Sequence, residues 1–203
     1  MTTPPNSADG PMVENATEHE PSAAPDASTN DPARLPARAL LSAEKLSFVD
    51  SPADNLAILL ERAIPSAASK FLRGHWLGHP LHPIMVTVPI GAWMSVPVLD
   101  LTGQSTAARR LLAFGIAAAV PASVTGLVEY TTLDIPQRRV AVVHVAANTV
   151  GISCFAQSWW RRRRSSGIAG LAWTVAGLMV AGLGGALGGH LSYAQGAGVL
   201  RER

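Results

Sequence analysis

Four long apolar segments constrain this chain more than any other feature of its sequence. They run over about residues 81–101, 111–132, 140–160 and 168–191. Each is close to the roughly 20 residues that a helix needs to cross the hydrocarbon core of a bilayer. The helices of a soluble bundle would carry polar outer faces, and these segments do not. We therefore predict an all-α membrane protein with four transmembrane helices, arranged as an antiparallel bundle because the connections are short.

The residues before these segments fall into two parts. Residues 1–42 are rich in Pro, Ser, Thr, Ala and acidic residues and contain no aromatic residue. Such a composition buries too little apolar surface to offset the entropy of ordering, so we predict a disordered tail. Residues 43–74 contain apolar side chains at helical spacing, which predicts an amphipathic helix at the membrane interface or against the bundle end. Residues 75–200 then form the transmembrane domain.

Charge and cysteine content exclude several classes of function. The net charge of +2 gives no support for nucleic-acid binding. The single cysteine, Cys154, excludes an internal disulfide, a cysteine-ligated zinc site and a cysteine-ligated iron–sulfur cluster within this chain. The sequence also shows no nucleophile–base pair, phosphate loop or dinucleotide motif. Nothing in it therefore predicts a hydrolase or a transferase.

The polar residues of the predicted bundle gather at one membrane face. An even number of crossings brings together the start of the first and third segments and the end of the second and fourth. Ionisable groups at membrane depth are costly and mark function by default, although histidines can also cap helices or lie among lipid headgroups. The residues that fall at this face are His79, His82, Glu129, Tyr130, His144, Asn148, His190 and Tyr193.

His79 and His82 each stand directly before a proline. A residue before proline is pushed toward extended backbone, so we predict that neither histidine lies on a helix. In polyproline form three residues rise about 9 Å, which is too far for the two rings to share one ion easily. We therefore expect separate roles for them.

Several histidines, one glutamate and a glycine-rich fourth segment suit a b-type haem bound in the bundle core. His144 is the best single candidate ligand, with His190 or one of His79 and His82 opposite it. Glu129 would hydrogen-bond a ligand imidazole or a haem propionate. The same histidines also suit Zn, Cu or non-haem Fe, with His144, His190 and His82 as ligands. Small residues at 177, 181, 185 and 189 would allow close helix packing or the approach of a flat cofactor.

The motifs GHPLHP, PIGAW, RRVAVVHVAANTV and GGHLSY resemble those of a bacterial membrane family catalogued as domain of unknown function 2231. The resemblance covers about residues 56 to 200. It implies a four-helix membrane domain, in relatives often fused to or encoded near a Rieske iron–sulfur domain. Since the sequence ends at Arg203, a Rieske partner of this chain would be a separate protein.

Three functions remain open at this point. The first is a redox-linked protein in the cell membrane, relaying electrons with a peripheral partner or a quinone. The second is an anchor or assembly subunit without a cofactor. The third is proton-coupled transport, against which stand the absence of a visible internal repeat and the small number of helices. A second copy of the chain is a further possible partner beside the lipid bilayer.

Basic residues indicate the orientation. Short loops at the face opposite the histidines carry Arg109, Arg110 and the run 161–164. The positive-inside rule places these loops in the cytoplasm. The histidines and both termini would then face outward.

Overall fold

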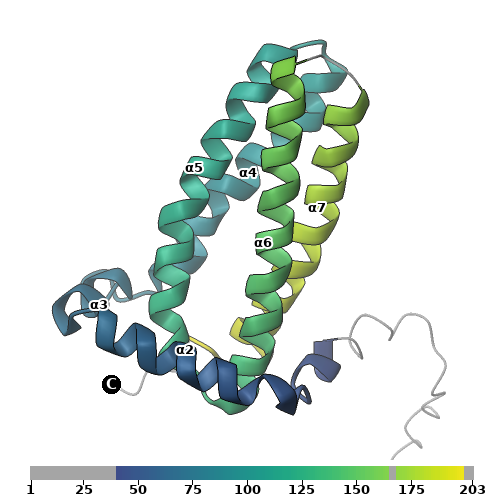
Figure 1. The fold of residues 1–203 in the computed structure, drawn as a ribbon. Helices are drawn as coiled ribbons and strands as arrows, with labels where there is room; N and C mark the ends of the chain where they lie inside the picture. Colours follow the sequence, from purple (N-terminus) through teal and green to yellow (C-terminus); the bar gives the residue numbers. More distant parts are fainter. Residues whose placement is uncertain (1–39, 165–167, 199–203) are drawn as a thin grey trace, which may run out of the picture.

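The computed structural model describes residues 40–164 and 168–198, and the described part is helical (Figure 1). Most of the predicted disordered tail therefore lies outside the described residues, while residues 40–43 form a helical turn. The elements, in order, are a 3₁₀ turn Ser47–Val49, α2 Asp50–Ala63, α3 Ser66–Leu72, α4 Leu81–Leu101, α5 Ser105–Tyr130, α6 Ile135–Arg164, α7 Ile168–Gly189 and a π-helical turn His190–Ala194.

The predicted fold is confirmed. Among the described residues, α4, α5, α6 and the helix Ile168–Ala194 are long and apolar enough to cross a membrane. α6 begins at Ile135 and reaches Arg164, so it is longer than the apolar segment at both ends. Arginine and glutamine are good helix formers, and their long side chains can extend to the headgroups while the backbone stays helical.

The bundle consists of two helical hairpins. α4 packs mainly on α5 and α6 mainly on α7, whereas α5 meets α6 and α4 meets α7 over smaller areas. Glycines allow the close approach within each hairpin: Gly115 faces the Trp93 ring and Gly177 faces the Phe155 ring.

The small residues of α7 that face α6 are not all those predicted. Gly184 faces Asn148 and Gly188 faces His144, whereas a side chain at Gly185 would point into open space. An interval of four residues drifts around a helix of 3.6 residues per turn, so a stripe at i, i+4 leaves the interface after two steps. The prediction that the small residues at 177, 181, 185 and 189 form one packing surface is therefore wrong beyond Ala181.

The two hairpins are repeats of one another, contrary to the expectation that the chain has no internal repeat. When α4 and α5 are aligned with α6 and α7 at a constant interval of 62 residues, identical residues recur without a gap. Asp100 and Arg162, which form an ion pair, are also 62 residues apart and are therefore equivalent positions. The identical pairs are His82/His144, Thr87/Thr149, Val88/Val150, Ile90/Ile152, Ala107/Ala169, Gly115/Gly177, Ala119/Ala181 and Gly126/Gly188.

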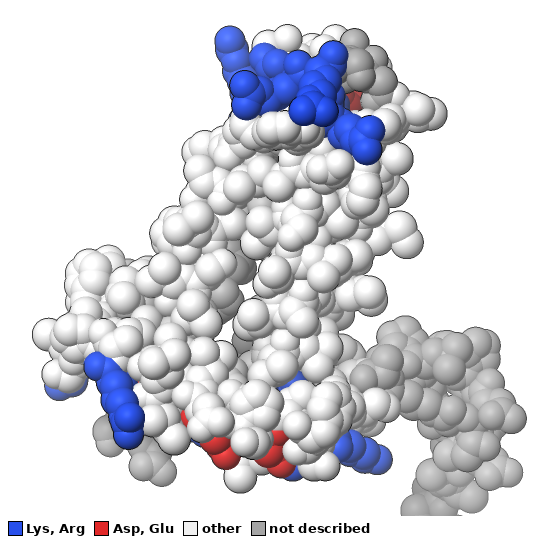
Figure 2. Space-filling model, in the orientation of Figure 1, with Lys and Arg blue, Asp and Glu red and all other residues white. Residues whose placement is uncertain are grey.

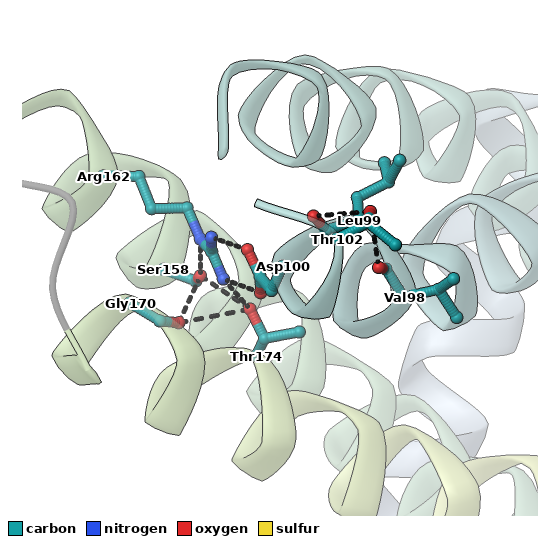
Figure 3. A network of polar contacts seen from close by, with 8 residues as sticks. All are labelled: Val98, Leu99, Asp100, Thr102, Ser158, Arg162, Gly170 and Thr174. Atoms are coloured by element: carbon teal, nitrogen blue, oxygen red, sulfur yellow. Dashed lines mark hydrogen bonds and ion pairs between the residues drawn. The ribbon is translucent and has the colours of Figure 1, made fainter. Parts of the chain in front are cut away.

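Equivalent residues of the two repeats meet across the bundle. The Trp93 and Phe155 rings stack with their centroids 4.2 Å apart. The Arg162 guanidinium binds both carboxylate oxygens of Asp100, at 2.5 and 2.7 Å (Figure 3). Equivalent residues can touch only near the axis that relates them. Since α4 and α6 run in the same direction, the hairpins are related by an approximate two-fold axis along the bundle.

α2 lies across one end of the bundle, near the end of α5 and the start of α6 (Figure 1). The Tyr130 hydroxyl donates to the Ala53 carbonyl at 3.0 Å, and Arg138 pairs with Asp54 at 2.7 Å. Ala53 and Ala57 are buried against the bundle. The predicted amphipathic helix therefore docks on the bundle end.

The opposite end of the bundle is basic. Figure 2 shows Lys and Arg gathered at the end remote from α2, and acidic groups near α2. The guanidinium groups of Arg163 and Arg164 lie over the rings of Trp159 and Trp160, each 4.9 Å from the ring centroid. Such a belt of aromatic and basic side chains is typical of a membrane–water interface.

Candidate functional site: two opposed histidines

His82 lies in the first turn of α4, which begins at Leu81. The prediction that it stands outside a helix is therefore wrong. Proline is tolerated in the first helical turn because the N–H groups there have no intrahelical partner to lose. This turn accommodates Pro83 and leaves the preceding histidine helical. His79 lies in an exposed bend before the helix, as predicted.

The His82 ring is held by α5. Its Nδ1 lies 2.9 Å from the Ala122 carbonyl oxygen, and the Thr125 hydroxyl is 3.5 Å from the same nitrogen. A carbonyl can only accept, so in the neutral ring Nδ1 carries the proton and Nε2 keeps its lone pair. Gly126 faces the ring, and a Cβ there would lie 2.8 Å from Cε1.

The His144 ring is held by α7 in the same manner. Its Nδ1 lies 2.8 Å from the Gly184 carbonyl oxygen, so Nε2 again keeps the lone pair. Gly188 faces the ring, and a Cβ there would lie 2.9 Å from Cε1. We call the carbonyl and the glycine that hold each ring its socket. Each histidine is 40 residues from its carbonyl partner, so the two sockets are equivalent parts of the repeat.

The surroundings of the two rings differ at two polar side chains. The Thr125 hydroxyl near His82 is matched by Leu187 in the second repeat. The Asn148 amide nitrogen lies 3.3 Å from both ring nitrogens of His144 and donates to the His144 carbonyl at 2.9 Å. The equivalent position in the first repeat is Val86. One ring therefore has an amide beside it and the other does not.

The two imidazoles lie close together where the hairpins meet. Their centroids are 6.4 Å apart and their planes are inclined at 82°. Both side chains are half-buried. His82 is the second residue of α4 and His144 is the tenth of α6, so both lie in the half of the bundle nearer α2. Together with Asn148 they form what we call the histidine pair site.

The other predicted site residues lie elsewhere. His190 Nε2 is 2.6 Å from Glu44 Oε1, which also accepts from the Gln195 amide at 3.0 Å. Tyr130 is buried beneath α2, Tyr193 is 92% exposed, and Glu129 is half-buried at the end of α5. The predicted single cluster is thus divided between the histidine pair site and a separate His190–Glu44 pair.

Sequence reasoning missed Glu44. It stands just after the predicted disordered tail and far along the chain from His190, so no local pattern indicates the contact. The equivalence of His82 and His144 did have a signal, which was the recurrence of His, Thr–Val and Gly at one constant interval.

A conventional metal centre would need more ligands than the histidine pair provides. In the part of the chain that the structure describes, no group of three or more His, Cys, Asp or Glu residues is placed to hold a metal ion. Among the described residues, the histidine pair therefore offers two imidazole rings with centroids 6.4 Å apart and no third His, Cys, Asp or Glu ligand beside them.

Residues 78–201 match the family described as "Predicted membrane protein (DUF2231)", which covers more than half of the sequence. The chain therefore belongs to this family, as its motifs indicated. Comparisons with curated proteins and with solved structures found no match.

Proposed function

We propose that this member of the DUF2231 family binds a b-type haem through His82 and His144 and carries electrons at one face of the cell membrane. The observation that carries the proposal is the histidine pair site. Two imidazoles from repeated helices lie with their centroids 6.4 Å apart, and each has its Nδ1 hydrogen-bonded to a backbone carbonyl. Metal-bound histidines almost always donate their other ring nitrogen in this way, which fixes the tautomer and orients the ring.

The separation of the rings supports this proposal. A metal bound to an imidazole nitrogen at about 2.0–2.1 Å lies about 3.2 Å from the ring centroid, so two opposed ligand rings stand about 6.3 Å apart. The observed separation is 6.4 Å. Two rings around a tetrahedral ion would stand roughly 5 Å apart, which fits less well.

The number of ligands favours haem over a bare ion. Zinc and non-haem iron usually take at least three protein ligands, whereas a porphyrin supplies four nitrogens and leaves two axial positions. Within the described residues the histidine pair provides two imidazoles and no third ligand. A haem held at both axial positions would supply one-electron chemistry without an open position for a substrate.

The electron partners follow from the position of the site. The histidine pair lies toward the starts of α4 and α6, at the end of the bundle that carries α2. The positive-inside rule would place this end outside the cytoplasm, because Lys and Arg gather at the opposite end. A peripheral redox protein of the Rieske type or a membrane quinone would exchange electrons there. A cofactor-free anchor remains the competing function, in which the two histidines only tie each hairpin together.

An absorption spectrum of the detergent-purified full chain, oxidised and then dithionite-reduced, tests the proposal when haem and metal are assayed in the same sample. We expect a Soret band that shifts on reduction and about one haem per chain. His82→Ala and His144→Ala should each abolish the low-spin spectrum, whereas His75→Ala at an exposed turn should leave it unchanged.

Two results would refute the proposal. The first is the absence of haem after expression with ample haem supply. The second is a spectrum that survives both histidine substitutions. Loss of haem in His190→Ala alone would instead move the ligand to the His190–Glu44 pair.

A further inference from the structure

We propose that Gly126 and Gly188 are equivalent positioning residues that hold the two ligand imidazoles nearly perpendicular to one another. The inference rests on the haem proposed above and adds the orientation of its two ligands. It is carried by the repeat, by the two glycine contacts and by the angle of 82° between the rings.

Each socket has two parts on the same face of one helix. The carbonyl oxygen of Ala122 or Gly184 accepts a hydrogen bond from Nδ1–H, and the glycine four residues later faces the Cε1 edge of the same ring. The hydrogen bond fixes where one ring atom points. The glycine then determines how closely the rest of the ring can approach the helix.

A methyl group at either glycine would displace the ring. The added Cβ would lie 2.8 Å from Cε1 of His82 or 2.9 Å from Cε1 of His144, closer than carbon atoms approach without a shift. The opposing atoms belong to a ring that can turn about its side-chain bonds, so rotation is the easiest relief. An alanine there should therefore change the ring plane before it disrupts the bundle.

The angle between axial imidazole planes has a direct spectroscopic consequence. Perpendicular planes leave the two iron d orbitals that interact with the ligand π systems close in energy. Oxidised low-spin haem then gives a strongly anisotropic EPR signal with a large maximum g value. Parallel planes separate these orbitals and give the ordinary rhombic signal. The 82° angle predicts the first kind of signal.

The same arrangement suits electron transfer. Rings fixed by a hydrogen bond and a packed glycine keep their positions when the iron changes charge, and hydrogen bonds to ligands tune the reduction potential. The repeat supplies one carbonyl and one glycine from each hairpin, so both rings are held by the same kind of contact. The Asn148 amide beside His144 and the Thr125 hydroxyl near His82 are the departures from symmetry.

The test is low-temperature EPR of the oxidised full chain, purified with its haem and assayed for haem content. For the wild type we expect the strongly anisotropic signal. Gly126→Ala and Gly188→Ala should each retain haem and shift the largest g value toward the rhombic range. Gly91→Ala and Gly182→Ala are matched controls, because a side chain at either position meets nothing within 4 Å. They should leave the signal unchanged.

A rhombic signal from haem-loaded wild type would overturn this inference while leaving the proposed function intact. Unchanged signals in both glycine variants would also overturn it. A protein without haem would refute the proposed function as well, and the haem assay separates these cases. If the alanine variants fail to fold, the wild-type spectrum alone still decides whether the planes are perpendicular.

Discussion

The ion pair between Asp100 and Arg162 should be a major stabiliser of the contact between the two hairpins. The side chains are only 14% and 8% exposed, and the guanidinium also donates to Ser158 at 3.1 Å and to Thr174 at 3.2 Å (Figure 3). Removing one partner of a buried pair leaves an uncompensated charge and costs about 3–5 kcal/mol. We expect Asp100→Ala to lower the free energy of unfolding by this amount.

The repeat allows a sharper version of this experiment. Asp100 and Arg162 are equivalent positions, so exchanging them in the double variant D100R/R162D recreates the ion pair with opposite polarity. The exchanged arginine would face Val96 and Leu112, the equivalents of Ser158 and Thr174, and would find no hydroxyl acceptor there. Each lost hydrogen bond to a charged group is worth about 1.5–3 kcal/mol. The exchange should therefore rescue the single variants only in part.

Reversible unfolding in mixed micelles, titrated with a denaturing detergent, would measure these differences. Arg161→Ala is the matched control, because Arg161 is exposed and has no hydrogen bond or ion pair among the described residues. A loss below about 1 kcal/mol in Asp100→Ala would contradict the assignment of a buried pair. Full rescue by the exchange would show that the two hydroxyl contacts contribute nothing.

Three further predictions concern the core and the end of the bundle that carries α2. Phe155→Ala removes a fully buried ring and should cost about 3–5 kcal/mol in the same unfolding assay. Hydrogen bonds from Arg139 hold the pKa of Asp50 below its usual range. The contact therefore stabilises the docked α2 fully at pH values above the ordinary carboxyl pKa. This stabilisation is lost as the pH falls through the lowered pKa of Asp50 in the folded protein. Hydrogen exchange of α2 should accelerate over that acidic range, and the acceleration should be absent in Asp50→Asn. Glu44→Gln should weaken the contact with His190 and raise proteolysis near residue 44 without changing any haem spectrum, whereas haem loss would place Glu44 in the site.

Secondary structure followed closely from the sequence because its causes are local. Long apolar segments at membrane length and short connections specify four antiparallel helices, and the structure has them. The apolar spacing within residues 43–74 likewise predicted an amphipathic helix, which the structure has as α2 at Asp50–Ala63. The exception was His82, where the rule for residues before proline gave way to the freedom of a first helical turn.

The candidate site was only partly predictable. The position of His144 inside an apolar segment made it the best candidate ligand. The even number of membrane crossings placed His82 and His190 at the same face. Neither argument says which residues face each other, because a helix can turn about its axis without changing its hydrophobic length. Packing decides that rotation. Glycines 126 and 188 let the rings of His82 and His144 lie against the neighbouring helices.

The amino-acid sequence by itself determined that this chain spans a membrane, that it has four helices and that its histidines gather at one face. Hydrophobicity and length are properties of single segments, so they can be evaluated from the sequence without knowledge of the fold. Only the tertiary structure decided that His82 opposes His144 and that His190 binds Glu44 instead. Those pairings depend on how two repeated hairpins pack around a shared axis, and packing is a property of the whole bundle.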